Sequence, residues 1–334
     1  MSVSLRLAMW TCGALAMAAI IGGCANDGAP KAGGKSQAIE TYVKGVYAYK
    51  AGEEDKAVET LRAAIQENPQ LIMPRTILGR ISKEKGDYAA AAEYYQALTQ
   101  LDPYEVNHHY QLGVSYQMLQ RLQDAAKSYR NAMKIDPNNF GSNMNLGLVY
   151  LALGETDNAV QFTKRAAEIE PASSEAQANM AVALDSRGEY EAAEIAYRKS
   201  LELAPKQSGT LINYSNNLLA QEKWRDAIEV LQQTLKMEDT PYLHKRLGDA
   251  YVGGGQYDLA TQQYNQAVHK NPQYYAAINE QARVAVLQYQ AGMELEDKKR
   301  DDALALWRRS LEIYPNQPRI KALLEDWERR MFSK

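Results

Sequence analysis

A proline recurs every 34 residues through the middle of this chain. The regular members of the series are Pro69, Pro103, Pro137, Pro171 and Pro205, and Pro272 and Pro315 continue it after irregular steps. A fixed period of this length is typical of a repeat architecture, in which one unit is copied and each copy packs on its neighbours. The question of how the chain folds therefore becomes the question of how one 34-residue unit folds.

Two columns of small residues appear when the chain is aligned in windows that end two residues after each proline. The eighth position holds Gly45, Gly79, Gly113, Gly147, Ala181, Ser215, Gly248 and Ala282. The twentieth position holds Ala57, Ala91, Ala125, Ala159, Ala193, Ala227, Ala260 and Ala303. Side chains this small predict two helices that approach closely where they cross.

The other residues of each window also favour a helix pair. Positions 4, 7, 8 and 11 share one helical face, and so do positions 20, 24 and 27. Glycine at position 15, as in Gly52 and Gly188, supplies the turn between the helices because it accepts positive φ angles. The proline ends the second helix, since it lacks an amide proton and restricts the residue before it.

These residues together resemble the tetratricopeptide repeat, and the resemblance covers nearly the whole chain after residue 37. It implies an all-α fold, a right-handed α-solenoid of about eight helix pairs over residues 38–315 with a C-terminal capping helix at 318–334. The expected repeats are 38–71, 72–105, 106–139, 140–173, 174–207, 208–240, 241–274 and 275–317.

Two repeats depart from the pattern, and the solenoid needs a cap. Repeat six is one residue short in KMEDTP (236–241), and repeat eight carries about nine extra residues around GMELEDKKRD (292–301), which predicts a longer first helix or turn. The final stretch places Ile320, Leu323, Leu324, Trp327 and Met331 on one helical face. An apolar face at this place predicts a helix that covers the stacking surface of the last repeat.

The N-terminus has the layout of an export signal. Arg6 precedes an apolar run from Leu7 to Ile21, and Gly22 and Gly23 follow before Cys24. Charge, apolar core and small residues in this order are typical of a signal peptide, and 15 apolar residues are fewer than the roughly 20 that a membrane span needs. We therefore expect residues 1–23 to be a signal peptide.

Cys24 can be a buried thiol, half of a disulfide with Cys12, or the attachment point of a lipid. The stretch Ile21-Gly22-Gly23-Cys24 resembles a bacterial lipobox, although leucine is more usual than isoleucine at its first position. The resemblance implies cleavage before Cys24, which removes Cys12, and acylation of the new N-terminus. It also implies the outer membrane of a Gram-negative cell, because Ala25 rather than aspartate follows the cysteine. Residues 24–37 then form the anchor and a flexible, Gly-rich tether.

Several functions lack support in the sequence. A net charge of −3 gives no general attraction for phosphate backbones, so nucleic acid is not an expected partner. No phosphate-binding loop, nucleophile elbow or paired-histidine motif is present. His108 and His109 are adjacent and point apart on a helix, which prevents them from chelating one metal ion. We expect no catalysis, no metal and no cofactor.

An amide side chain recurs at position 6 of successive first helices. Gln111, Asn145, Asn179 and Asn213 form this set, which we call the amide ladder. An amide offers both a donor and an acceptor, so it can pair with the backbone of an extended peptide of any sequence. The ladder resembles the groove of the repeat domain of O-linked N-acetylglucosamine transferases. Neighbouring groove positions hold Asn107, Tyr110, Met144, Asn216 and Arg246.

Sequence reasoning therefore predicts a lipid-anchored scaffold that binds an extended segment of a partner protein on the concave side of the solenoid. The order of lipobox, tether and repeats is similar to pilus-assembly pilot lipoproteins, secretin-assembly factors and scaffolds of peptidoglycan hydrolases. Two alternatives remain open. The chain can be a structural spacer without a groove ligand, or a regulatory subunit of an envelope glycosyltransferase or protease.

Overall fold

The structure, a computed structural model, describes residues 32–292 and 297–332. The predicted signal peptide, Cys24 and the tether up to residue 31 lie outside the described residues. The described part contains helices and no β-strand. The helices are α1 (Ala32–Lys50), α2 (Glu54–Glu67), α3 (Ile72–Glu84), α4 (Tyr88–Leu101), α5 (Val106–Met118), α6 (Leu122–Ile135), α7 (Phe140–Leu153), α8 (Thr156–Ile169), α9 (Ser174–Arg187), α10 (Tyr190–Leu203), α11 (Ser208–Ala220), α12 (Trp224–Leu235), α13 (Pro241–Gly253), α14 (Tyr257–Lys270), α15 (Tyr275–Ala291), α16 (Asp297–Ile313) and α17 (Pro318–Phe332).

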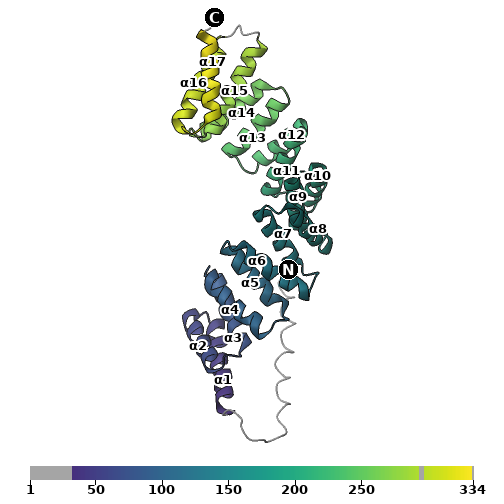
Figure 1. The fold of residues 1–334 in the computed structure, drawn as a ribbon, viewed down its shortest axis with the longest axis vertical. Helices are drawn as coiled ribbons and strands as arrows, with labels where there is room; N and C mark the ends of the chain where they lie inside the picture. Colours follow the sequence, from purple (N-terminus) through teal and green to yellow (C-terminus); the bar gives the residue numbers. More distant parts are fainter. Residues whose placement is uncertain (1–31, 293–296, 333–334) are drawn as a thin grey trace, which may run out of the picture. The chain divides into compact units, whose positions relative to one another are not determined.

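The helices pack as successive pairs, which confirms the predicted all-α repeat fold. The chain forms two compact units, Met1–Arg80 and Ile81–Lys334. In the first unit α1 packs on α2, and in the second each first helix packs on its own second helix, from α5 with α6 to α15 with α16 (Figure 1). In the second unit each second helix also packs on the first helix of the next repeat, as α6 does on α7 and α8 on α9.

The eight alanines of the second helices lie at the centre of every pair. Each of them, from Ala57 to Ala303, has no solvent-exposed surface. The glycines of the opposite column face residue 24 of the same window: a Cβ added to Gly113 would lie 2.6 Å from the ring of Tyr129, and one added to Gly248 would lie 2.5 Å from the ring of Tyr264. Absence of a side chain is what lets a fully buried aromatic ring fill the space between the two helices.

The turn inside each of the first seven repeats uses a left-handed residue at position 15. Five of these are glycines, among them Gly188 with φ 83° and Gly255 with φ 72°. The same conformation occurs without glycine at Gln120 (φ 59°) and Glu222 (φ 58°), in repeats three and six. The backbone geometry is therefore set by the packing of the pair, because it persists where the residue does not favour it.

The first helix starts earlier than the sequence suggested. We expected residues 24–37 to form a flexible tether, and α1 instead begins at Ala32. Once packed residues have nucleated a helix, each further residue that joins it adds one backbone hydrogen bond. Lys35, Gln37 and their neighbours therefore extend α1, although their sequence has no apolar period. The second half of the predicted tether is helical.

The irregular repeats keep the helix pair. In repeat six the second helix is 12 residues long, and the Thr240 hydroxyl accepts from the Leu243 amide to cap α13, with Pro241 in its first turn. In repeat eight both α15 and α16 are 17 residues long, which confirms the predicted longer first helix and lengthens the second as well. The extra residues are thus divided between the two helices and the segment that joins them.

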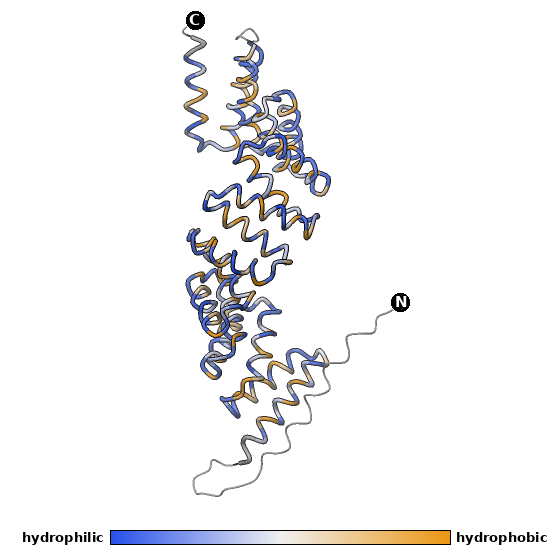
Figure 2. The backbone as a smooth tube through the Cα atoms, turned by 90° about the vertical axis from the view of Figure 1, so that its right-hand side faces the viewer, coloured by the Kyte–Doolittle hydropathy of each residue, from blue (hydrophilic) through white to orange (hydrophobic). Residues whose placement is uncertain are grey.

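The last helix covers the end of the stack. The ring of Trp327 on α17 joins a buried cluster with Tyr289, Leu304 and Trp307, and Ile320, Leu323 and Leu324 pack against it. The side chain of Met331 lies outside the described residues. Figure 2 shows the same division within the helices, where apolar segments alternate with polar ones along the backbone. Each helix buries one face and exposes the other.

Close packing at position 8 predicts a large effect of Gly113→Leu. The new side chain must displace the fully buried ring of Tyr129, so we expect a loss of roughly 1–3 kcal/mol in unfolding free energy. Gly209→Leu is the matched control, because a Cβ there meets nothing within 4 Å. Urea unfolding followed by circular dichroism measures both. Equal losses in the two variants would contradict the packing argument.

The left-handed turns predict opposite effects of two substitutions. Glu222→Gly should raise stability, and Gly255→Ala should lower it by about 1–2 kcal/mol, because a left-handed conformation is strained for residues that have a Cβ. A Cβ at Gly255 meets nothing within 4 Å, so the loss there is conformational rather than steric. Thermal unfolding of both variants tests the prediction. A lower melting temperature for Glu222→Gly would show that its side chain stabilises the turn.

Candidate functional site: an amide ladder on the first helices

The amide ladder lies on four consecutive first helices, α5, α7, α9 and α11, each in contact with the next. The neighbouring position 7 holds the core residues Leu112, Leu146 and Tyr214, which are buried. Position 6 therefore falls at the edge of the core. Gln111, Asn145 and Asn179 are half-buried there, and Asn213 is exposed.

Two of the four amides already bond within the protein. The Asn145 amide donates to the Tyr110 hydroxyl across α5 and α7, at 3.3 Å. The Gln111 amide donates to Asn107 Oδ1 at 3.2 Å, and Gln111 Oε1 accepts from the Lys83 ammonium. Burial lowers the pKa of Lys83. These amides are held in fixed orientations, so a peptide would meet a preorganised surface at this end of the ladder.

The other two amides have no hydrogen-bond partner among the described residues. The Asn179 Nδ2 atom is buried and unpaired, whereas the Asn213 side chain is exposed to solvent. An unpaired buried donor costs free energy until an acceptor reaches it. Asn179 and Asn213, on adjoining helices, are therefore the ladder members with unused capacity for a ligand.

The predicted site residues at the far end of the ladder form a separate cluster. The guanidinium of Arg246 donates to Asn216 Oδ1 at 2.7 Å and contacts Asp249 at 3.3 Å. The Asn216 amide and the Tyr242 hydroxyl lie 3.3 Å apart. Asp249 also accepts from the Tyr264 hydroxyl at 2.9 Å. Asn216 and Arg246 are thus brought together, and their polar groups are largely occupied by each other.

Met144 precedes Asn145 on α7 and is half-buried. Its flexible thioether suits an adaptable contact surface. Tyr110 has a further role that the sequence did not show, because its ring packs on that of Tyr129 with 5.9 Å between centroids. Tyr110 therefore links the ladder to the buried ring beside Gly113.

The ladder does not continue into the first two repeats. The equivalent positions hold Val43 in α1 and Ile77 in α3, and position 2 of the same helices holds Ile39 and Met73. Ile39, Val43 and Met73 are exposed by 54%, 42% and 55%, whereas Ile77 is buried. The change from aliphatic to amide side chains at position 6 is visible in the aligned sequence windows.

A polar network holds α11, and with it Asn213, against its neighbours. The Asn217 amide donates to Asp185 Oδ1 at 2.5 Å and to the Tyr190 carbonyl at 2.9 Å. The Gln221 amide and the Lys223 ammonium both donate to Glu194, at 3.0 and 2.6 Å. The network therefore connects α9, α10, α11 and the residue before α12.

The two carboxylates of this network have opposite pKa directions. Burial raises the pKa of Asp185 despite hydrogen bonds from Asn217 and Tyr197. Burial also acts to raise the pKa of Glu194, but hydrogen bonds from Lys223, Gln221 and Arg198 outweigh it and lower the pKa. Two cationic donors reach Glu194, whereas those at Asp185 are neutral, which explains the difference.

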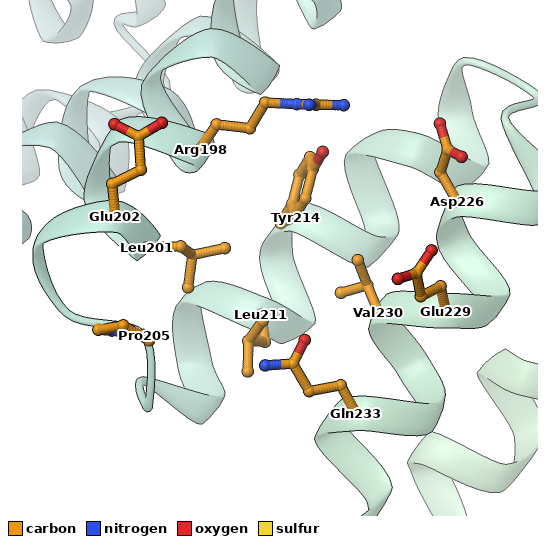
Figure 3. Close-up of a pocket in the computed structure, with 10 residues that line it drawn as sticks. All are labelled: Arg198, Leu201, Glu202, Pro205, Leu211, Tyr214, Asp226, Glu229, Val230 and Gln233. Carbon is orange, nitrogen blue, oxygen red and sulfur yellow. The ribbon is translucent and has the colours of Figure 1, made fainter.

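The structure also contains cavities that sequence reasoning missed. The cavity in Figure 3, of about 570 Å³, lies between α10 and α12 over α11. Its apolar lining includes Leu201, Leu211 and Val230, and carboxylates stand at both sides. A second cavity, of about 410 Å³, lies at the corresponding place in repeats three and four. Met133 lines it at the position of Leu201, and Phe162 lines it at the position of Val230. Both cavities lie between second helices, away from the ladder.

Other chemistry is not apparent in the described residues. His108 is buried, and a ring nitrogen of His109 lies 2.9 Å from the Pro103 carbonyl oxygen. Within residues 32–292 and 297–332, no three His, Cys, Asp or Glu side chains are grouped as metal ligands. Over the same ranges, no helix combines the length and apolar character required to cross a bilayer.

The lowered pKa of Glu194 predicts a pH-dependent stability. The folded-state pKa lies below that of the unfolded chain, so ionised Glu194 stabilises the fold above the unfolded pKa of about 4.3 and loses this effect as pH falls through the folded pKa. Glu194→Gln should therefore lower the free energy of unfolding by roughly 1–3 kcal/mol at pH 7 and by much less near pH 3. Urea unfolding at both pH values measures this. A cost independent of pH would contradict the role of the charge.

Sequence profiles of the tetratricopeptide repeat match most of the chain after residue 77. The matches cover residues 78–140, 117–182, 174–207, 215–275 and 245–318. No curated protein sequence is a significant match.

Solved structures of repeat proteins share the fold. A tetratricopeptide repeat protein from Parabacteroides merdae has 19% identity and a TM-score of 0.53, over 72% of this chain and 94% of that one. The protein pilF of Pseudomonas aeruginosa has 19% identity and a TM-score of 0.52, over 66% and 97%. The C-terminal part of a repeat protein from Cytophaga hutchinsonii has 13% identity and a TM-score of 0.60, over 73% and 97%. By its profile matches and its stacked helix pairs, the chain belongs to the tetratricopeptide repeat family.

Proposed function

We propose that this protein is a membrane-anchored scaffold that binds an extended segment of a partner protein along the amide ladder and thereby assists assembly of an envelope complex. Binding of protein or peptide partners is the usual role of tetratricopeptide repeats. The observation that carries the ladder as the binding site is the pair of unused amides, Asn179 and Asn213, on consecutive first helices.

An extended backbone has the chemistry that these amides lack. Each peptide unit offers a carbonyl acceptor and an amide donor, and successive units repeat both. The exposed Asn213 amide can pair with either group, and the Asn179 Nδ2 donor, which is buried in the unliganded protein, would find a carbonyl oxygen once the side chain turns outward. Each such bond contributes roughly 0.5–1.5 kcal/mol net, partly offset by ordering of the peptide. We expect micromolar affinity from a few bonds together with apolar contacts at Met144 and Tyr110.

The membrane anchor is proposed from the sequence. The apolar run from Leu7 to Ile21 and the small residues before Cys24 favour export and acylation at that cysteine. Two or three acyl chains would hold the protein stably, whereas one would not. The protein would then lie on the periplasmic face of a bacterial membrane. Ala25, which follows the cysteine, favours the outer membrane.

The kind of complex is proposed on the order of anchor, tether and repeats. Pilus, secretion and cell-wall machineries all use lipoproteins that resemble this arrangement, and the repeat fold is shared with pilF. The shared motifs are those of the repeat and do not identify a pathway. The pathway has to be identified from the partner protein. A structural spacer would retain every interaction when the ladder is removed, and a regulatory subunit would co-purify with a catalytic activity that the isolated chain lacks.

The decisive experiment compares partner capture by the wild type and by Asn145→Ala/Asn179→Ala/Asn213→Ala in the native envelope. We expect one partner to be crosslinked and captured by the wild type and reduced at least tenfold in the variant. Mass spectrometry identifies the partner, and a synthetic peptide of its captured segment then gives the affinity by calorimetry. Asn179→Ala/Asn213→Ala should cause most of the loss, because Asn145 is already bonded to Tyr110.

Gln123→Ala/Gln262→Ala/Gln266→Ala is the matched control, since these amides are exposed on the second helices α6 and α14. The control should capture the partner as the wild type does. Circular dichroism establishes that all variants are folded. An unchanged partner set in the ladder variant would show that the ladder is not the binding site.

A further inference from the structure

An exposed apolar stripe runs along the first helix. Ile39, Val43 and Tyr47 on α1 are spaced four residues apart, and their exposed fractions are 54%, 42% and 71%. Residues at this spacing lie on the same side of an α-helix. We call these three residues the α1 stripe. Large apolar side chains gathered on one exposed face are unusual in a soluble protein and indicate an interaction surface.

The end of a solenoid explains part of this exposure, but it does not explain the residue types. Position 10 is nearly or fully buried in later repeats, as at Val149, Asn217 and Val284, whereas its counterpart in α1 is the exposed Tyr47. Positions 3 and 7 of α1 have become the charged residues Glu40 and Lys44, which form an ion pair of 2.9 Å. A terminal repeat usually has a polar outer face. In α1, positions 3 and 7 thus carry polar residues, whereas positions 2, 6 and 10, which form the stripe, remain apolar.

We propose that the α1 stripe docks on the surface of the lipid bilayer to which Cys24 is attached. This inference rests on the proposed lipid anchor. It adds a second contact with the membrane, made by protein side chains, which would fix the orientation of the first compact unit. The lipid on Cys24 keeps the protein at the membrane, and the stripe decides which face of α1 turns toward it.

The length of chain before α1 supports the bilayer as the occupant. α1 begins eight residues after Cys24, and eight residues span at most about 28 Å even when fully extended. Ile39 lies seven residues further along, about 11 Å at the rise of an α-helix. The stripe is therefore the exposed apolar surface that acylation would hold closest to the membrane, at a high effective concentration.

The side-chain chemistry suits a membrane interface. Aliphatic residues insert among the acyl chains at the headgroup boundary, while a tyrosine ring packs there with its hydroxyl in water. Tyr47, Val43 and Ile39 provide this combination on one face. Lys50 lies at the end of the same helix, and cationic side chains are attracted to anionic headgroups.

Photo-crosslinking of the processed chain, residues 24–334, tests the proposal. Cys24 is the single cysteine left after processing, so its thiol can be coupled to a maleimide lipid in phosphatidylcholine–phosphatidylglycerol vesicles. Benzoylphenylalanine is introduced in place of Tyr47, and in a matched protein in place of Tyr104. Tyr104 is the control because its exposed fraction, 82%, is at least as high and it lies in the second compact unit.

We expect at least fivefold more lipid adduct at position 47 than at position 104, measured by mass spectrometry. Ile39→Ser/Val43→Ser should reduce the adduct at position 47 to the level of the control, without loss of helical circular dichroism. Equal adduct yields at the two positions would overturn the proposal. Protein–protein adducts at position 47, with a dimer in analytical ultracentrifugation, would instead assign the stripe to a second copy and overturn it too.

Failure of this inference can be told from failure of the proposed anchor, because the coupling to vesicles does not depend on natural acylation. The anchor is tested by the mass of the N-terminal peptide from the native envelope. Lipid adducts at position 47 together with an unmodified Cys24 would contradict the proposed anchor and support the membrane contact of the α1 stripe. An acylated Cys24 without adducts would keep the anchor and overturn the stripe.

Discussion

The close approach of two helices at one small residue is the constraint on which this structure depends. Position 20 is an alanine without exposed surface in all eight repeats, and position 8 is never larger than alanine or serine. Where it is glycine, the missing side chain makes room for a buried residue such as Tyr129 or Tyr264. Because the pairs are closed in this way, position 6 falls beside the core residue of position 7 on successive first helices. The amide ladder is a consequence of this repetition.

The repeat also separates structural from functional chemistry. Groups that hold the repeats together are bonded to each other, such as the buried Asn217 with Asp185 and Lys223 with the buried Glu194. The amides of the ladder lie at the margin of the core, and two of them, Asn179 and Asn213, have no partner among the described residues. The four amides of the ladder, which are alike in the sequence, thus divide into two that are already hydrogen-bonded within the protein and two that are not. This division makes Asn179 and Asn213 more informative targets than Asn145.

The two compact units differ in the surface of their first helices. The first unit carries Ile39, Val43 and Tyr47 exposed on α1, and the second carries amides at the equivalent position 6. A scaffold with an apolar surface and a polar surface can hold two different neighbours, and we propose the bilayer for the first and an extended peptide for the second. The assignment of each surface follows from its chemistry: apolar side chains recognise an apolar phase, and amides recognise a polypeptide backbone.

The sequence by itself determined the fold, because the two columns of small residues and the period of 34 are local properties of the chain that only a stack of helix pairs satisfies. It also determined the candidate residues of the ladder, since a fixed period places equivalent positions on equivalent faces. Only the tertiary structure decided which of them are free: the Tyr110 hydroxyl reaches Asn145 from a residue 35 positions away. It likewise revealed the left-handed Gln120 and Glu222, the extension of α1 to Ala32 and the exposure of the α1 stripe. The left-handed turns and the exposure of these side chains depend on how the helices pack, which no local pattern records.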